Sequence, residues 1–136
     1  MANAQHVLIA DDEQFVQKTF KFCLEEAGYE VGLARDGREA LRYVQAHKPA
    51  VVLLDVFMPE SDGLETLLEI KRYAPATRVI VMSGGGVKNR YEFLSMASKL
   101  GADGVVRKPL SPRALIAILQ SASSRTSSHR PQIARS

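Results

Sequence analysis

Hydrophobic and polar positions along the chain follow two different periods. Short, mostly apolar runs at 6–10, 29–34, 51–54, 78–82 and 103–107 are typical of strands, and the third is apolar at every position, as a fully buried strand would be. After each run, apolar residues recur every three or four positions, which is the spacing of a helix with one buried face. Five strands that alternate with five helices predict an α/β fold built on a doubly wound parallel sheet.

Turn and capping residues mark where these helices begin and end. Asp36 with Glu39 three residues later forms a capping-box pattern, and Ser111 before Pro112 opens the last helix. Gly28 ends the first helix, which starts near residue 14. The buried face of this first helix is expected to consist of Val16, Phe20, Cys23 and Ala27.

Length and composition restrict the class of protein. At 136 residues and 46% hydrophobic content, the chain suits one domain with a substantial core. Its single cysteine, Cys23, cannot form an internal disulfide, which favours a reducing compartment, and we expect a cytoplasmic protein. The N-terminus does not resemble a signal peptide, and no apolar run approaches membrane-spanning length.

The net charge of +3 comes from the tail alone. Residues 1–120 hold all 15 acidic residues and 15 of the 18 basic ones, so this part is neutral, and the excess is Arg125, Arg130 and Arg135. A nucleic-acid-binding protein usually concentrates basic residues on one face, so direct DNA binding is not expected. Residues 123–136 are rich in Ser and Arg and are predicted to be disordered.

Reactive side chains stand where the predicted strands end. Asp11 and Asp12 follow the first strand, Asp55 the third, Ser83 the fourth and Lys108 the fifth. An aspartate after a strand often only caps a turn, so each position alone is weak evidence. Because the carboxyl ends of parallel strands meet at one edge of the sheet, the set predicts a site there.

The residue types at this edge indicate a metal and a phosphoryl group. Three carboxylates repel one another unless a cation lies between them. Mg²⁺ suits such a place, since it binds oxygen ligands, needs few carboxylates and engages phosphate. Lys108 could pair with Asp55 or with a phosphoryl oxygen, and Ser83 could donate a hydrogen bond to one.

Over roughly residues 5–122 the chain resembles the response-regulator receiver domains of two-component signalling. The resemblance rests on the pair Asp11-Asp12, on Asp55 in LLDVFMP, on Ser83-Gly84 and on Lys108-Pro109. It implies a flavodoxin-like fold with the strand order 2-1-3-4-5. We also expect a stand-alone response regulator with a receiver domain at 1–122, because no helix-turn-helix or catalytic output module follows in the sequence.

The resemblance implies a role for each of the three aspartates at this edge. Asp55 would accept a phosphoryl group from a histidine kinase or a histidine phosphotransferase. Asp12, Asp55 and the backbone carbonyl of Phe57 would hold Mg²⁺, with Asp11 acting through water. Such a protein assists its own phosphorylation and dephosphorylation without being a turnover enzyme.

The resemblance also implies a switch. Ser83 and Lys108 would bind the phosphoryl oxygens, and Ser83, Gly84 and Val105 would pass the change on. Val105 stands where many receivers carry an aromatic residue, so the usual aromatic rotamer change is open to question here. Output would be through a protein target on the face formed by the fourth helix, fifth strand and fifth helix, or through a homodimer, without membrane binding.

Two alternatives remain at this point. A Mg²⁺-dependent aspartyl-phosphate hydrolase, similar to haloacid-dehalogenase phosphatases, would carry a second aspartate two residues after the nucleophile, where this chain has Phe57. A receiver-like module could instead work by protein binding without phosphorylation. The complete set of site residues argues against the second alternative, and Val105 keeps it open.

Overall fold

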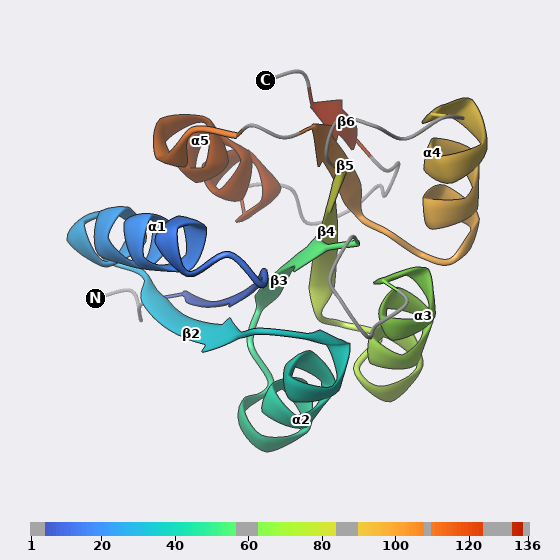
Figure 1. Cartoon of the computed structure of the whole chain (residues 1–136), viewed down its shortest axis with the longest axis horizontal. Coiled ribbons are helices and arrows are strands. Elements are labelled where there is room, and N and C mark those ends of the chain that lie inside the picture. The colour runs from blue at the N-terminus through green and yellow to red at the C-terminus, as the bar shows by residue number, and fades with distance from the viewer. Residues whose placement is uncertain (1–4, 57–62, 84–89, 108–109, 124–131, 135–136) are drawn as a thin grey trace.

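A parallel sheet lies at the centre of the protein, with helices on both of its faces (Figure 1). The computed structural model describes residues 5–56, 63–83, 90–107, 110–123 and 132–134. The strands are β1 (His6–Ala10), β2 (Glu30–Ala34), β3 (Val51–Asp55), β4 (Arg78–Ser83), β5 (Gly104–Arg107) and β6 (Gln132–Ala134). The helices in these ranges are α1 (Gln14–Glu26), α2 (Gly37–His47), α3 (Gly63–Tyr73), α4 (Arg90–Lys99) and α5 (Pro112–Ser123).

The strands are arranged in the order β2-β1-β3-β4-β5-β6, and every neighbouring pair is parallel. The first five strands therefore have the predicted order 2-1-3-4-5, and the doubly wound α/β fold is confirmed. β2 forms one edge of the sheet.

A short sixth strand lies within residues 123–136, the stretch predicted to be disordered, of which the structure describes only residue 123 and residues 132–134. Gln132–Ala134 pairs with the outer side of β5, in a register that sets Ile133 beside Val105, and α5 extends to Ser123. The outer edge of a strand carries unpaired N–H and C=O groups that even a very short segment can satisfy. Three residues with one branched apolar member are too few to give a periodic signal, so the sequence did not reveal this strand.

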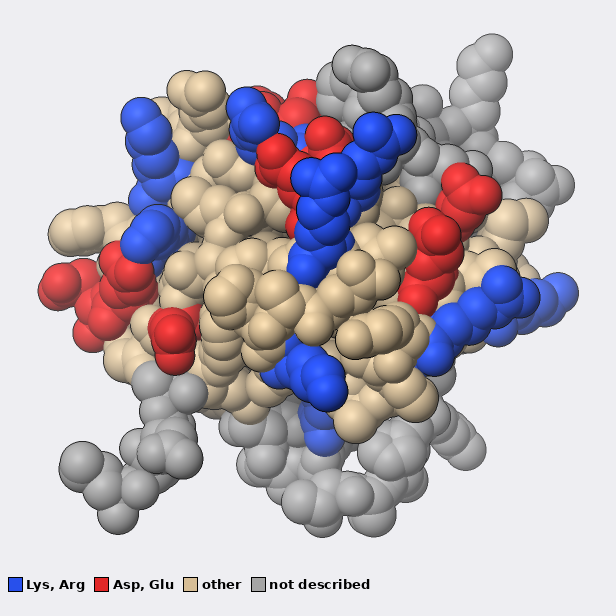
Figure 2. Space-filling model, turned by 90° about the horizontal axis from the view of Figure 1, so that it is seen from below, with Lys and Arg blue, Asp and Glu red and all other residues tan. Residues whose placement is uncertain are grey.

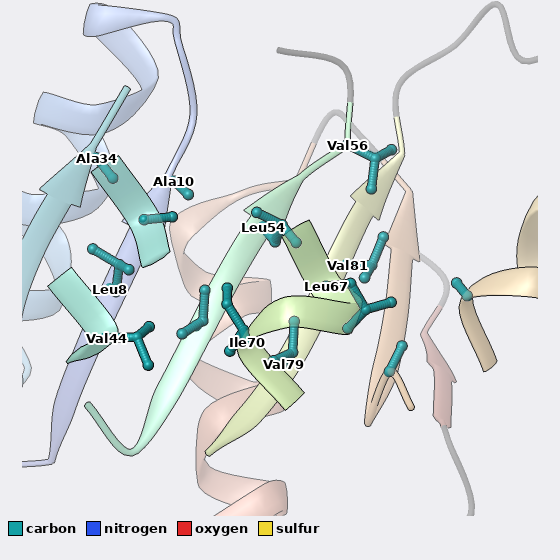
Figure 3. Close-up of a cluster of buried hydrophobic side chains, with 14 of the residues drawn as sticks. Leu8, Ala10, Ala34, Val44, Leu54, Val56, Leu67, Ile70, Val79 and Val81 are labelled. Atoms are coloured by element: carbon teal, nitrogen blue, oxygen red, sulfur yellow. The ribbon is translucent and has the colours of Figure 1, made fainter. Parts of the chain in front are cut away.

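The core consists of two layers because side chains alternate across the strands. Leu8, Leu54 and Val81 are fully buried on one face, where α2, α3 and α4 cover the sheet (Figure 3). Ile9 and Leu53 are fully buried on the other face, together with residues of α1 and α5. Burying one such side chain stabilises a fold by about 1.5–3 kcal/mol, so these two layers are the main source of stability.

The predicted helix caps are present. The Asp36 side chain accepts a hydrogen bond from the Glu39 backbone N–H at 2.9 Å, and Ser111 Oγ accepts one from the Ala114 N–H at 3.0 Å. Each cap satisfies a backbone donor that has no partner within its helix.

The buried face of α1 differs from the prediction. Gln17, Phe20 and Leu24 are its buried residues, whereas Cys23 is only half-buried and Ala27 is an exposed C-cap. The predicted stripe was built from apolar residues alone and was therefore rotated away from Gln17. A glutamine at a buried helical position needs hydrogen-bond partners.

A hydrogen-bonded lysine joins three segments at the amino-terminal edge of the sheet. Lys71 Nζ donates to the backbone oxygens of Pro75 and Thr77 at 3.2 and 2.9 Å, and to Asp103 Oδ2 at 3.0 Å. Asp103 also accepts from the Val79 backbone N–H at 2.9 Å. The end of α3, the start of β4 and the turn before β5 are therefore held together by one polar network.

A second contact at this edge depends on a glycine. The Tyr43 hydroxyl is hydrogen-bonded to His6 Nε2, and its ring also lies 4.3 Å from that of His47, centroid to centroid. A Cβ atom on Gly32 would lie 2.2 Å from the Tyr43 ring. Only glycine leaves room on β2 for a tyrosine that reaches across to β1.

We expect Gly32→Ala to destabilise the protein by about 1–3 kcal/mol, as overpacking of a fitted contact does. The added methyl group must displace the Tyr43 ring from His6. Urea denaturation measures the loss. Tyr43→Ala removes the obstacle, so the double variant should lose less than the sum of the two single variants, and additive losses would contradict the contact.

Candidate functional site

The register between β1 and β3 brings two predicted site residues together. These parallel neighbours are paired from Val7 with Val51 to Ala10 with Leu54. One further step in the same register places Asp11 next to Asp55. Backbone pairing of the two strands therefore positions both carboxylates.

Three carboxylates gather at this carboxyl-terminal edge of the sheet. Asp11, Asp12 and Asp55 each offer an oxygen within 4.8 Å of the others. Asp11 is fully buried and Asp55 is 3% exposed, whereas Asp12 is exposed. The predicted grouping of these residues is confirmed, and the site is open to solvent on the side of Asp12.

Hydrogen bonds fix the loop that carries the acidic pair. The Asp11 backbone N–H donates to the Ala34 carbonyl at 3.0 Å, and Asp11 Oδ1 accepts from the Glu13 N–H at 3.0 Å. Gln17 Nε2 donates to the same Ala34 carbonyl at 2.8 Å. Gln17 is not among the predicted site residues, although its spacing of three and seven residues from Phe20 and Leu24 places it on the buried face of α1.

The end of β3 is also hydrogen-bonded to β4, its neighbour on the side opposite β1. The Val56 N–H donates to the Met82 carbonyl of β4 at 3.2 Å, and Val56 is buried. The start of α3 packs so closely that a Cβ atom on Gly63 would lie 2.3 Å from the Val56 Cα. The residue after Asp55 is thus enclosed by β4 and α3.

The remaining predicted residues fall into two groups. Ser83 is the last residue of β4 and is paired with Arg107, one step beyond the pairing of Asp55 with Met82, so its backbone lies at the same edge. Val105 is 3% exposed and belongs to the layer under α2, α3 and α4. Lys108, Phe57 and Gly84 lie outside the described residues.

The donor set fits a small, hard divalent cation. All of the ligand atoms that the three aspartates offer are carboxylate oxygens, the type that Mg²⁺ prefers, and their closeness lets one ion contact more than one of them. The exposure of Asp12 leaves a side through which water and a phosphoryl group could reach the ion.

An exposed ion pair lies next to Ala34. Arg35 Nη2 donates to Glu39 Oε2 at 2.8 Å, and this hydrogen bond raises the pKa of Arg35 and lowers the pKa of Glu39. Solvent screens such a pair, so it adds little to stability.

The surface near α2 and α3 carries both signs of charge. Seen from below relative to Figure 1, Lys and Arg side chains alternate with Asp and Glu in small groups, separated by uncharged residues (Figure 2). None of the helices in the described part of the chain has both the length and the hydrophobicity needed to cross a bilayer.

These features define the class of the protein. The chain belongs to the response regulator receiver domain family, whose model matches residues 7–120. The order 2-1-3-4-5 of the first five strands and the acidic residues at the carboxyl-terminal edge of the sheet agree with that membership.

Two relatives show how much of the chain the family accounts for. It is 35% identical over 120 residues to the chemotaxis protein CheY of Thermotoga maritima, covering 88% of this chain and 98% of that protein. It is 36% identical over 124 residues to the probable transcriptional regulator ycf27 of Cyanophora paradoxa, covering 91% of this chain. The matched region is 50% of that regulator, so the chain spans about half its length.

Solved structures agree with the fold. The CheY-like receiver domain protein of Methanospirillum hungatei JF-1 superposes with a TM-score of 0.83 at 26% identity, covering 90% of this chain and 95% of that chain. The response regulator CheY4 of Vibrio cholerae gives a TM-score of 0.78 at 30% identity, covering 88% and 98%.

We expect Asp12→Asn to stabilise the metal-free protein and to weaken its response to Mg²⁺. Removing one of three neighbouring charges relieves repulsion worth about 1 kcal/mol in a solvated site. Thermal unfolding in EDTA should show a higher Tm than wild type, and most of the rise in Tm that Mg²⁺ gives wild type should be lost. Glu26→Gln, an exposed charge removal elsewhere on α1, is the control and should change neither property. A lower Tm in EDTA would contradict the proposed repulsion.

Proposed function

We propose that the protein is a phosphoryl-accepting signalling switch of a two-component or phosphorelay system, with Asp55 as the phosphoacceptor. One observation carries the proposal: Asp55 ends a central strand, and two further carboxylates have an oxygen within 4.8 Å of its own. Membership of the receiver family supports this assignment.

The proposed reaction transfers the phosphoryl group from a phosphohistidine. A carboxylate oxygen of Asp55 attacks phosphorus, the new P–O bond forms as the P–N bond breaks, and the electron pair of that bond returns to the imidazole. Asp55 lies almost fully buried at the end of a fixed strand, so it meets the donor in one orientation. No general base is needed, because the attacking group is already a carboxylate.

The residues around Asp55 would bind the charges of the reaction. Asp12, Asp55 and the backbone carbonyl of Phe57 would hold Mg²⁺, with Asp11 contributing through water. When bound, Mg²⁺ supplies the positive charge that offsets the carboxylates and the phosphoryl oxygens. Lys108 and Ser83 would bind the phosphoryl oxygens after transfer.

The proposed output is a change at the face formed by α4, β5 and α5, read by a protein target or a second copy. Val105 is enclosed in the core layer and has no ring to move, so the change would pass through the backbone at Ser83 and Gly84. The donor would be a histidine kinase or a histidine phosphotransferase in the cytoplasm, and the protein would not turn over a substrate.

A second candidate is a receiver that binds its target without phosphorylation. The observation that favours it is Val105, a small aliphatic residue at the position from which the family's aromatic switch would operate.

Phosphorylation with a small donor separates these candidates. Wild type incubated with Mg²⁺ and acetyl phosphate should gain a single phosphoryl group by intact mass, and Asp55→Asn should gain none. Asp36→Asn keeps a helix-capping side chain while removing a different aspartate, and it should be modified like wild type. Absence of the adduct with both acetyl phosphate and a phosphorylated histidine kinase would favour the second candidate.

A further inference from the structure

One backbone carbonyl at the end of β2 joins the acidic loop to α1. The oxygen of Ala34 accepts the Asp11 N–H at 3.0 Å and the Gln17 side-chain amide at 2.8 Å. A carbonyl oxygen has two lone pairs, so both hydrogen bonds can form at once. A strand, a loop and a helix are therefore tied to the same atom.

The side chain of Gln17 is buried, so its amide depends on this hydrogen bond. Gln17 is 6% exposed and shares its helix face with Phe20 and Leu24, so an apolar residue could fill the same space. Burying an amide is unfavourable unless it is hydrogen-bonded. What glutamine adds at this position, beyond packing, is the donated N–H.

The loop that carries the acidic pair has little freedom of its own. Only three residues, 11–13, connect β1 to α1. At the α1 end, the Gln17 N–H donates to the Glu13 carbonyl at 3.0 Å, and the Glu13 N–H donates to Asp11 Oδ1. The position of α1 relative to β2 therefore sets the positions of Asp11 and Asp12.

We propose that Gln17 is a positioning residue of the acidic site. By holding α1 to the Ala34 carbonyl, its side chain fixes the loop that presents Asp11 and Asp12, and so it sets the affinity of the site for Mg²⁺. This inference rests on the proposed function only in that it takes Mg²⁺ as the ion of the site.

The direct test is Gln17→Met, which keeps the size of the side chain and removes the donor. Titration calorimetry with MgCl₂, well below the Tm of the variant, should give a dissociation constant about tenfold higher than that of wild type, the usual size of effect for a residue behind a ligand. Hydrogen exchange in EDTA adds a readout that needs no metal: the Asp11 amide should exchange faster in the variant.

Thr77→Val is a matched control. Thr77 is 5% exposed, and its hydroxyl donates to the Pro49 carbonyl at 3.0 Å, a buried side-chain-to-backbone bond at the opposite edge of the sheet. Its loss should lower the Tm by an amount similar to Gln17→Met while leaving the affinity for Mg²⁺ unchanged. Equal weakening in both variants would show a general loss of stability and would overturn the proposal.

Gln17→Glu provides a second variant of equal length. An added negative charge near the site would by itself favour a cation, so weaker Mg²⁺ binding in this variant must come from lost positioning. If wild type binds Mg²⁺ and both Gln17 variants bind it equally well, this inference fails and the proposed function stands. If wild type binds no Mg²⁺, the metal site of the proposed function fails, and this inference fails with it.

Discussion

The mutual repulsion of three carboxylates is the constraint on which the rest of the structure depends. Asp11, Asp12 and Asp55 bring an oxygen each within 4.8 Å of the others, although like charges so close together oppose folding. Their separation is set by the parallel pairing of β1 with β3, and both strands are buried on both faces. The backbone holds the charges in place, and the apolar layers supply the free energy that this requires.

The amino-terminal edge of the sheet carries stabilising contacts, and the carboxyl-terminal edge carries the candidate site. At the amino-terminal edge, Lys71 links α3, β4 and the turn before β5, and Tyr43 reaches from α2 to β1. At the carboxyl-terminal edge, Asp11, Asp12 and Asp55 lie close together, and their carboxylate oxygens are of the type that suits a divalent cation. A sheet whose strands are fixed at one end can present repelling groups at the other without losing its order.

The sequence predicted most of this fold, because its signals are local. Strand runs and helical spacing gave the elements, capping residues such as Asp36 and Ser111 gave their ends, and strand ends gave the acidic cluster. Contacts between distant segments could not be predicted in the same way. The hydrogen bond from Gln17 to Ala34 and the space that Gly32 leaves for Tyr43 depend on the packing of separate elements. The residues around Gln17 and Gly32 in the sequence do not show that Ala34 and Tyr43 are the residues they contact.

The pairing of β6 with β5 has a consequence for recognition. Without β6, β5 would be an edge strand with unpaired backbone N–H and C=O groups. Such an edge can pair with a strand from another molecule. Gln132–Ala134 already occupies that edge. Another protein could therefore add a strand on this side of the sheet only by displacing residues 132–134 from β5.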